Sequence, residues 1–471
     1  MVIPLFLIPA AVFFTFFYNL WAIVVSLVVC SYFALREKNI PDEAFYFIPV
    51  IFAGIFVSVL SKAQFDSFTF ILQMMLYAVF FIIGLKISFS KNKSMLLVPL
   101  SGFLFLPFLS CSFFNYNPNI VSSYIALLIL LLWMSGVQKS FKYALSFLGL
   151  YFIVVNGSYI ALFSVFSGWI FTEKKKFLPF LILFSAAAVI FNLHSASERI
   201  LWFYEAAKIL FFKPFGAGFF SAKYYLAGKS FPATLFLHSF FAQYVAEGGL
   251  LCIIAAVIFL AHFWERIRRG PYAYAALSVL VLGALDLSYY YPAQGMTASL
   301  ILGISAGASV DGKRVMTGIK LKLWRLLFAC CLILSLVMFY NSRNFAVGNY
   351  FLFRGNPEKA LQSYDKTFRF PKEPALSSAR AAALSFIYDK NRKSEILEKS
   401  FALQNEAIIV KRADSPAFSD YLASRRTGDT GKLRNSCRRV LYINGIVELV
   451  KSEEKTPSQS PPWKGGEDSE E

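Results

Sequence analysis

The residues best suited to chemistry lie in a polar segment, residues 194–237, and at the start of the apolar run that follows it. Arg199, Trp202, Phe203 and Ala206 have the spacing of one helical face. This spacing predicts an amphipathic helix that lies on a membrane surface with its apolar side down. An arginine there is either an ordinary interfacial anchor or, through its forked donors, a binding group for an anion.

A turn and a histidine follow this helix. Pro214 is expected to end the helix, and Gly216 and Gly218 would allow a tight backbone approach with free amides. His238 begins the next apolar run at the same interface, where an imidazole that titrates near neutral pH can move a proton. Taken alone, this histidine has a second interpretation, a hydrogen-bonded interfacial side chain.

Two acids lie within the later apolar runs. Glu247, followed by two glycines, fits either a functional group or a helix-packing site. Asp286 is costly in an apolar span, so it is expected to face a cavity or a partner, in a structural or a functional role.

The order of these motifs resembles the O-antigen ligase and polymerase family of membrane proteins. In that family the outer loop has an Arg-x-x-x-Trp-like start, a Pro-x-Gly-x-Gly turn, and a His-Ser or His-Asn dipeptide followed by Glu-x-Gly. Here the matching segments are Arg199 to Trp202 (one residue shorter), Pro214 to Gly218, His238-Ser239 and Glu247 to Gly249. The segments 285–293 and 300–307 are similar to the spans after the loop, so the resemblance is densest over residues 197–307.

The resemblance implies an enzyme that moves a glycan from an undecaprenyl-pyrophosphate carrier to a glycan, lipid or protein acceptor. Arg199 would hold the pyrophosphate, and His238 would activate the acceptor hydroxyl or assist the leaving group. We expect the substrates to contact Trp202, Glu205, Lys208, Lys213, Gly216, Gly218, Ser239, Glu247 and Asp286. The family often carries an arginine in an earlier Gly-Ser-Arg-Gly-like turn, but Tyr159 stands at that place. Lys208 or Lys213 would then substitute, or pyrophosphate binding is weaker, or activity is lost.

The elements that must position these residues are transmembrane helices. With 57% hydrophobic and 16% charged residues, the chain cannot be a soluble domain. Roughly thirteen apolar runs between residues 3 and 340 predict an all-α polytopic membrane protein of roughly 11–13 spans. Asn19 and Asn156-Gly157 are the reasons for splitting the stretches 3–35 and 143–171 into two spans each.

Charge and composition narrow the partners. The net charge of +18 comes mostly from short loops between apolar runs, which indicates membrane orientation rather than nucleic-acid binding. The basic loops fall on one side, the cytoplasm, and segment 194–237 falls on the other. The six cysteines show no paired or metal spacing, and no zinc motif, dinucleotide fingerprint or nucleophile elbow occurs. We expect no cofactor.

The sequence predicts three parts: a membrane domain at 1–340, a periplasmic helical module at 341–450 and a disordered tail at 451–471. Small residues from Ala346, a turn at Gly355-Asn356 and a closing Pro371 resemble a tetratricopeptide repeat, with a degenerate copy at 379–405. Such a module would recruit a protein partner.

Two other functions compete with the enzyme. A transporter of lipid-linked sugars would have a similar number of spans, but it should show paired repeats and polar residues spread through several spans. A non-catalytic scaffold that presents the repeat module would explain the missing arginine. The concentrated polar loop favours the enzyme.

Overall fold

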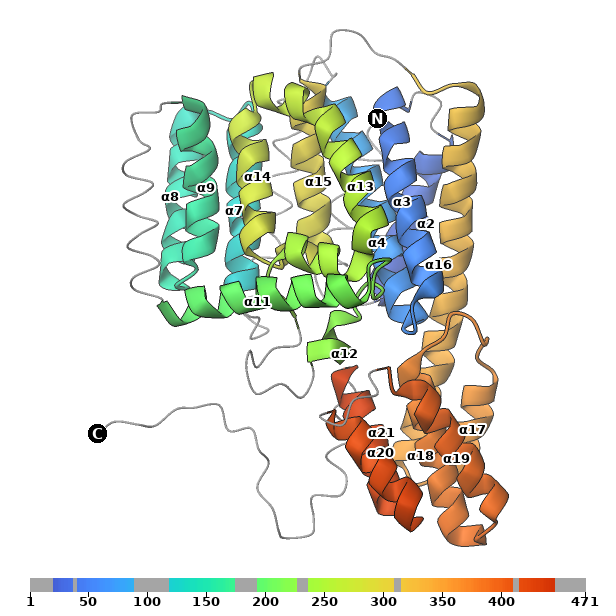
Figure 1. Ribbon diagram of the computed structural model, residues 1–471. Coiled ribbons are helices and arrows are strands. Elements are labelled where there is room, and N and C mark those ends of the chain that lie inside the picture. Colours follow the sequence, from blue (N-terminus) through green and yellow to red (C-terminus); the bar gives the residue numbers. More distant parts are fainter. Residues whose placement is uncertain are drawn as a thin grey trace, which may run out of the picture. The chain divides into compact units, whose positions relative to one another are not determined.

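The computed structural model describes residues 20–36, 40–88, 118–173, 193–226, 236–308, 315–409 and 415–444 (Figure 1). Within these ranges the chain is all-α, as the sequence predicts, with no strand and one isolated bridge between Pro41 and Val315. The chain divides into two compact units, Met1–Ser342 with Phe368–Glu373, and Arg343–Thr367 with Pro374–Glu471. The first is called unit 1 and the second unit 2.

Unit 1 is a bundle of mostly apolar helices; the long helices coincide with apolar runs of the sequence, whereas α11 and α12 belong to the polar segment 194–237. The elements are α2 (Leu20–Arg36), η1 (Asp42–Tyr46), α3 (Phe47–Leu60), α4 (Gln64–Ser88), α7 (Pro118–Met134), α8 (Lys139–Val155), α9 (Tyr159–Glu173), α11 (Leu193–Phe212), α12 (Ala222–Leu226), α13 (Phe240–Arg269), α14 (Ala273–Leu285), η3 (Ser288–Tyr290), α15 (Pro292–Gly307) and α16 (Gly318–Phe353). The division between the units falls within α16. The runs at 3–18 and 94–114, and most of the run at 177–193, lie outside the described residues.

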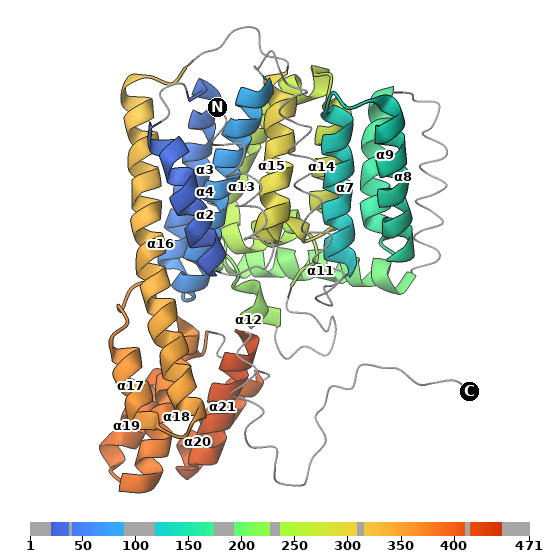
Figure 2. The ribbon, with the colours of Figure 1, turned by 180° about the vertical axis from the view of Figure 1, so that it is seen from behind.

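Glycines let the central helices pack closely. A methyl group on Gly84 of α4 would lie 2.4 Å from the carbonyl oxygen of Leu300, and one on Gly303 of α15 would lie 2.1 Å from that of Phe81. The backbones of α4 and α15 therefore touch, which is how helices associate where burial of apolar surface supplies no driving force. Figure 2 shows α7, α8 and α9 beside α14, on the side of the α4–α15 pair away from α16.

The outer surface of the bundle is apolar. Large side chains such as Phe56 of α3, Phe147 of α8 and Ile333 of α16 are 48%, 75% and 63% exposed. Within the described ranges, four helices are long and apolar enough to cross a membrane, and they span Asp42–Leu60, Gln64–Ser88, Phe240–Arg269 and Gly318–Phe353. Long apolar helices with an apolar exterior indicate a protein embedded in a membrane.

The two ends of the bundle differ in charge. At one end α2 stops at Arg36, α8 begins at Lys139 and α13 stops at Arg269 (Figure 1). We call this the basic end. At this end η1 is joined to α13 by an ion pair of 3.0 Å between Arg266 and Glu43, and to α16 by one of 2.9 Å between Lys320 and Asp42. The opposite end, where α11 lies, is called the site end.

Unit 2 is built from the last turns of α16 and from α17 (Pro357–Asp365), α18 (Pro374–Asn391), α19 (Ser394–Ala407), α20 (Pro416–Thr427) and α21 (Thr430–Ile443). A turn at Gly355, with φ +72°, ends α16, and the Asn356 side chain accepts from the Lys359 amide to cap α17. Gly348 lies beneath the Tyr364 ring, so a small residue is required there. The likeness to a tetratricopeptide repeat stays a prediction.

Candidate functional site

Helix α11 lies crosswise over the site end of the bundle (Figure 1). Trp202, Ala206 and Ile209 are buried on its protein-facing stripe. The expected stripe is therefore partly wrong, because Phe203 points outward and is 50% exposed. The reason is that α11 is apolar on two opposite faces, and only one of them packs on the bundle. Arg199 belongs to the second turn of α11, but its side chain lies outside the described set.

His238 and Trp202 come together although they belong to different elements. The half-buried imidazole stacks on the indole with ring centroids 4.4 Å apart and an interplanar angle of 22°. His238 has φ +46°, a left-handed backbone that residues other than glycine adopt rarely and at a cost of about 1–3 kcal/mol. Such a conformation persists only when its surroundings enforce it, so the packing around His238 must fix the position of this residue.

The turn between α11 and α12 packs into a break in α13. Gly249 of α13 has φ +66°, and a methyl group there would lie 2.2 Å from the Gly216 nitrogen. The Leu250 amide donates to the Pro214 carbonyl over 2.8 Å. The Gly-Gly pair after Glu247 therefore provides both the kink and the space that the turn occupies.

The two glycines of this turn have the predicted backbone freedom but not free amides. Gly216 and Gly218 have φ +94° and +99°, and a methyl group on Gly218 would lie 2.0 Å from the Ser61 hydroxyl oxygen. Their amides donate instead to the Lys213 carbonyl (2.8 Å) and the Glu247 carbonyl (3.0 Å). The expectation that these amides are free is thus wrong, because the Gly216 amide closes the turn and the Gly218 amide docks the turn on α13.

Glu247 is completely buried. One carboxylate oxygen, Oε1, accepts from the Ala222 amide at 2.9 Å and from the Gln243 side chain at 3.1 Å. The other, Oε2, accepts from the Tyr290 hydroxyl at 2.5 Å. Donors from α12, α13 and η3 converge on this acid, which favours positioning over direct contact with a substrate.

Ser239 and Asp286 join the start of α13 to the end of α14. The Ser239 hydroxyl caps α13 by accepting from the Ala242 amide and donates to the Ala284 carbonyl at 2.8 Å. The Phe240 amide donates to the Asp286 carbonyl at 2.9 Å. The half-buried Asp286 carboxylate accepts from the Ser123 hydroxyl at 2.6 Å, so the acid faces a partner, as expected.

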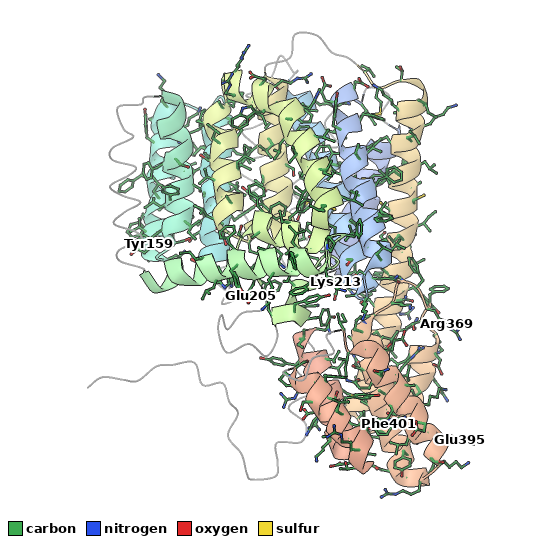
Figure 3. The ribbon with its side chains drawn as sticks, in the orientation of Figure 1. Tyr159, Glu205, Lys213, Arg369, Glu395 and Phe401 are labelled. Atoms are coloured by element: carbon green, nitrogen blue, oxygen red, sulfur yellow. The ribbon has the colours of Figure 1, made fainter. Side chains whose placement is uncertain are left out.

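The remaining predicted residues are spread over the same end. Glu205 is half-buried on α11, and Lys213 is exposed just beyond it (Figure 3). Lys208 is also half-buried on α11. Tyr159, at the place of the absent family arginine, is 50% exposed at the start of α9. The Asn156 side chain of that turn donates to the Ser122 hydroxyl at 3.4 Å, next to the partner of Asp286.

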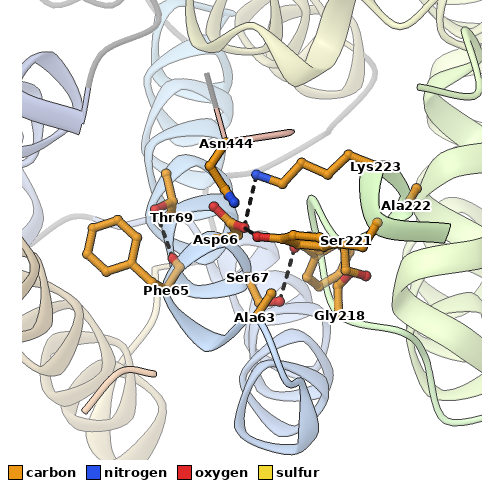
Figure 4. Close-up of polar contacts among 12 residues, drawn as sticks. Ala63, Phe65, Asp66, Ser67, Thr69, Gly218, Ser221, Ala222, Lys223 and Asn444 are labelled. Carbon is orange, nitrogen blue, oxygen red and sulfur yellow. Dashed lines mark hydrogen bonds and ion pairs between the residues drawn. The ribbon is translucent and has the colours of Figure 1, made fainter. Parts of the chain in front are cut away.

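Sequence reasoning missed a charged cluster at the same end. Lys223 Nζ of α12 lies 3.0 Å from Asp66 Oδ2 of α4 (Figure 4), and the Tyr224 hydroxyl donates to the same oxygen at 3.1 Å. Burial, and secondarily the charge of Asp66, raise the pKa of the Glu373 carboxyl to about 8, whereas Lys223 opposes this shift. The sequence indicates this cluster only weakly, because its residues are far apart along the chain.

No family model matches the chain, and no curated protein or solved structure matches it. The assignment of a function therefore depends on the residues at the site end alone.

This end combines an aromatic ring, an imidazole and several fixed polar groups. The imidazole can take or give a proton, and the buried indole on which it stacks fixes the plane of its ring. Within the described ranges no group of three or more His, Cys, Asp or Glu side chains could hold a metal ion.

Proposed function

We propose that the chain transfers a glycan from an undecaprenyl-pyrophosphate carrier to an acceptor at the outer face of the cytoplasmic membrane. It would act as a ligase or polymerase of O-antigen or another surface polysaccharide. The observation that carries this proposal is the stacking of His238 on Trp202, three residues after Arg199, at the end of the bundle opposite the basic residues. A proton-transfer group thus lies beside the helix that bears an anion-binding group.

The proposed reaction is a displacement at the sugar. The acceptor hydroxyl oxygen attacks the anomeric carbon, the bond from that carbon to the pyrophosphate oxygen breaks, and undecaprenyl pyrophosphate leaves with the electron pair. His238 takes the proton of the hydroxyl. Arg199 pairs with the pyrophosphate and stabilises the charge that develops on it, which we expect to be the larger contribution.

Because the family arginine is absent, another residue would have to supply a second positive charge. Lys208 is half-buried on the flank of α11 and Lys213 is exposed one residue beyond its end. Either ammonium group would add charge near the carrier. The acceptor, a glycan, a lipid or a protein, would approach from the outer side, and unit 2 would recruit a protein partner there.

We further propose roughly 11–13 spans in an inner membrane, with the basic end in the cytoplasm and the site end outside. Unit 2 would then be extracytoplasmic and the N-terminus cytoplasmic. Alkaline phosphatase is active only outside the cytoplasm, so we expect an inactive fusion after Lys175 and an active one after Asn356. The opposite result at either position contradicts this topology.

The activity can be tested directly with the purified full-length chain in vesicles. We expect it to lengthen or modify a candidate acceptor when undecaprenyl-pyrophosphate glycan is supplied, without added metal or nucleotide. Release of undecaprenyl pyrophosphate should match the glycan transferred mole for mole. Movement of the labelled donor across the vesicle membrane without transfer would favour the transporter, and neither transfer nor movement would favour the scaffold.

A further inference from the structure

The left-handed backbone of His238 is held on both sides by fixed neighbours. On the preceding side, the Leu237 amide donates to Oε1 of Gln243 at 3.0 Å. On the following side, Ser239 is anchored to Ala284 and Phe240 to Asp286, over 2.8 Å and 2.9 Å. Leu237 and Gln243 are both completely buried, so this bond is shielded from water.

Glu247 fixes the orientation of Gln243. The two residues lie one turn apart on α13, and the Gln243 side-chain nitrogen donates to Glu247 Oε1 at 3.1 Å. With its amide nitrogen committed to the acid, Gln243 must present its oxygen to Leu237. Glu247 is fixed in turn by donors from Ala222 and Tyr290.

We infer that Gln243 and Glu247 are positioning residues: acting through Leu237, they hold His238 in its left-handed conformation and keep its imidazole on Trp202. The inference rests on the proposed function for its catalytic meaning. Its structural content, the placement of the imidazole, can be measured without any transfer assay.

The measurement uses the fluorescence of Trp202. A protonated imidazole in contact with an indole quenches it, so protonation of His238 on lowering the pH should change the emission of Trp202. The contribution of Trp202 is obtained by subtracting the signal of a Trp202→Phe variant. We call this change in Trp202 emission with pH the step. We expect the parent protein to show the step and a His238→Ala variant to lack it.

Gln243→Met removes both bonds of the amide at similar size, and we expect the step to lose at least half of its amplitude. Gln243→Asn keeps the amide, but its shorter side chain places the amide too far from Leu237, so the step should lose a similar fraction of its amplitude. Glu247→Gln should retain the step, because its oxygen can accept from Ala222 and Gln243 while the Tyr290 hydroxyl turns to accept from its nitrogen. Gln73→Met is the matched control, since Gln73 is a completely buried glutamine of α4.

A parent-like step in folded Gln243→Met or Gln243→Asn would overturn the inference, as would a step that persists in His238→Ala. The two Gln243 variants differ in polarity and size, so that if one fails to accumulate the other still decides. If the Gln243 variants lose the step while the parent transfers no glycan, the positioning is supported and the proposed function fails.

Discussion

Replacing His238 by alanine is expected to lower the turnover of glycan transfer about a hundredfold or more, the usual effect of removing a general base. The imidazole stacks on Trp202 at the site end, where it can accept the proton of an acceptor hydroxyl. Donor binding should stay largely intact, because the pyrophosphate is assigned to Arg199. The measurement is kcat for transfer in vesicles, together with binding of the undecaprenyl-pyrophosphate donor.

Helix α13 contains a matched control. Its His262 also stacks on an aromatic ring, that of Tyr46, with centroids 3.6 Å apart, but it lies at the basic end. His262→Ala should therefore transfer glycan at the parent rate. Equal rates for His238→Ala and the parent protein would remove His238 from the mechanism, and equal losses in both variants would indicate a general effect of losing a stacked ring.

Helices could be predicted well because apolar runs and breakers are local signals. The split at Asn156-Gly157 is confirmed: α8 ends at Val155, α9 begins at Tyr159, and Gly157 adopts φ +64° between them. The last apolar run was expected to end at residue 340, but α16 continues to Phe353. No proline or glycine turn interrupts it before Gly355, so a change to polar composition did not end the helix.

The site could be predicted only in part, because its contacts join distant segments. The sequence indicates that Trp202 and His238 belong to one region, but their stacking depends on how α11 packs on α13. The Pro-Phe-Gly-Ala-Gly turn was expected to have free amides, and the Glu-Gly-Gly motif fitted either a functional group or a helix-packing site. In the structure the two dock on each other. A local pattern cannot distinguish an amide that binds an anion from one that binds a carbonyl.

Gln243 was missed, although the sequence contains a usable signal. Gln243 and Glu247 are two polar residues four positions apart within an apolar run, which places them on the same face of one helix. Polar side chains in such a run are costly unless they bond to each other or to the backbone. This spacing predicts a buried pair, and its partners, Leu237, Ala222 and Tyr290, follow only from the fold.

Replacing Arg199 is the second change with a large expected effect. The donor carries two anionic phosphates that must be held at the depth of the lipid headgroups, where a charged residue is tolerable. A hydrogen bond to a charged group contributes about 1.5–3 kcal/mol, which corresponds to roughly 10- to 150-fold in affinity or rate. Arg199→Ala should therefore reduce transfer about a hundredfold. Arg199→Lys keeps the charge but loses the forked geometry, so a reduction of about tenfold is expected.

The loss in Arg199→Ala should affect the donor and not the acceptor, which identifies the phosphate contact. Because α11 lies at the site end, Lys322→Ala, an exposed lysine in the first turns of α16 at the basic end, is the control and should transfer at the parent rate. Arg199→Ala should raise KM for the donor and leave KM for the acceptor unchanged. If Arg199→Ala and Arg199→Lys both transfer glycan at the parent rate, the arginine is only an interfacial anchor, and the carrier must be held by other cations such as Lys208 or Lys213.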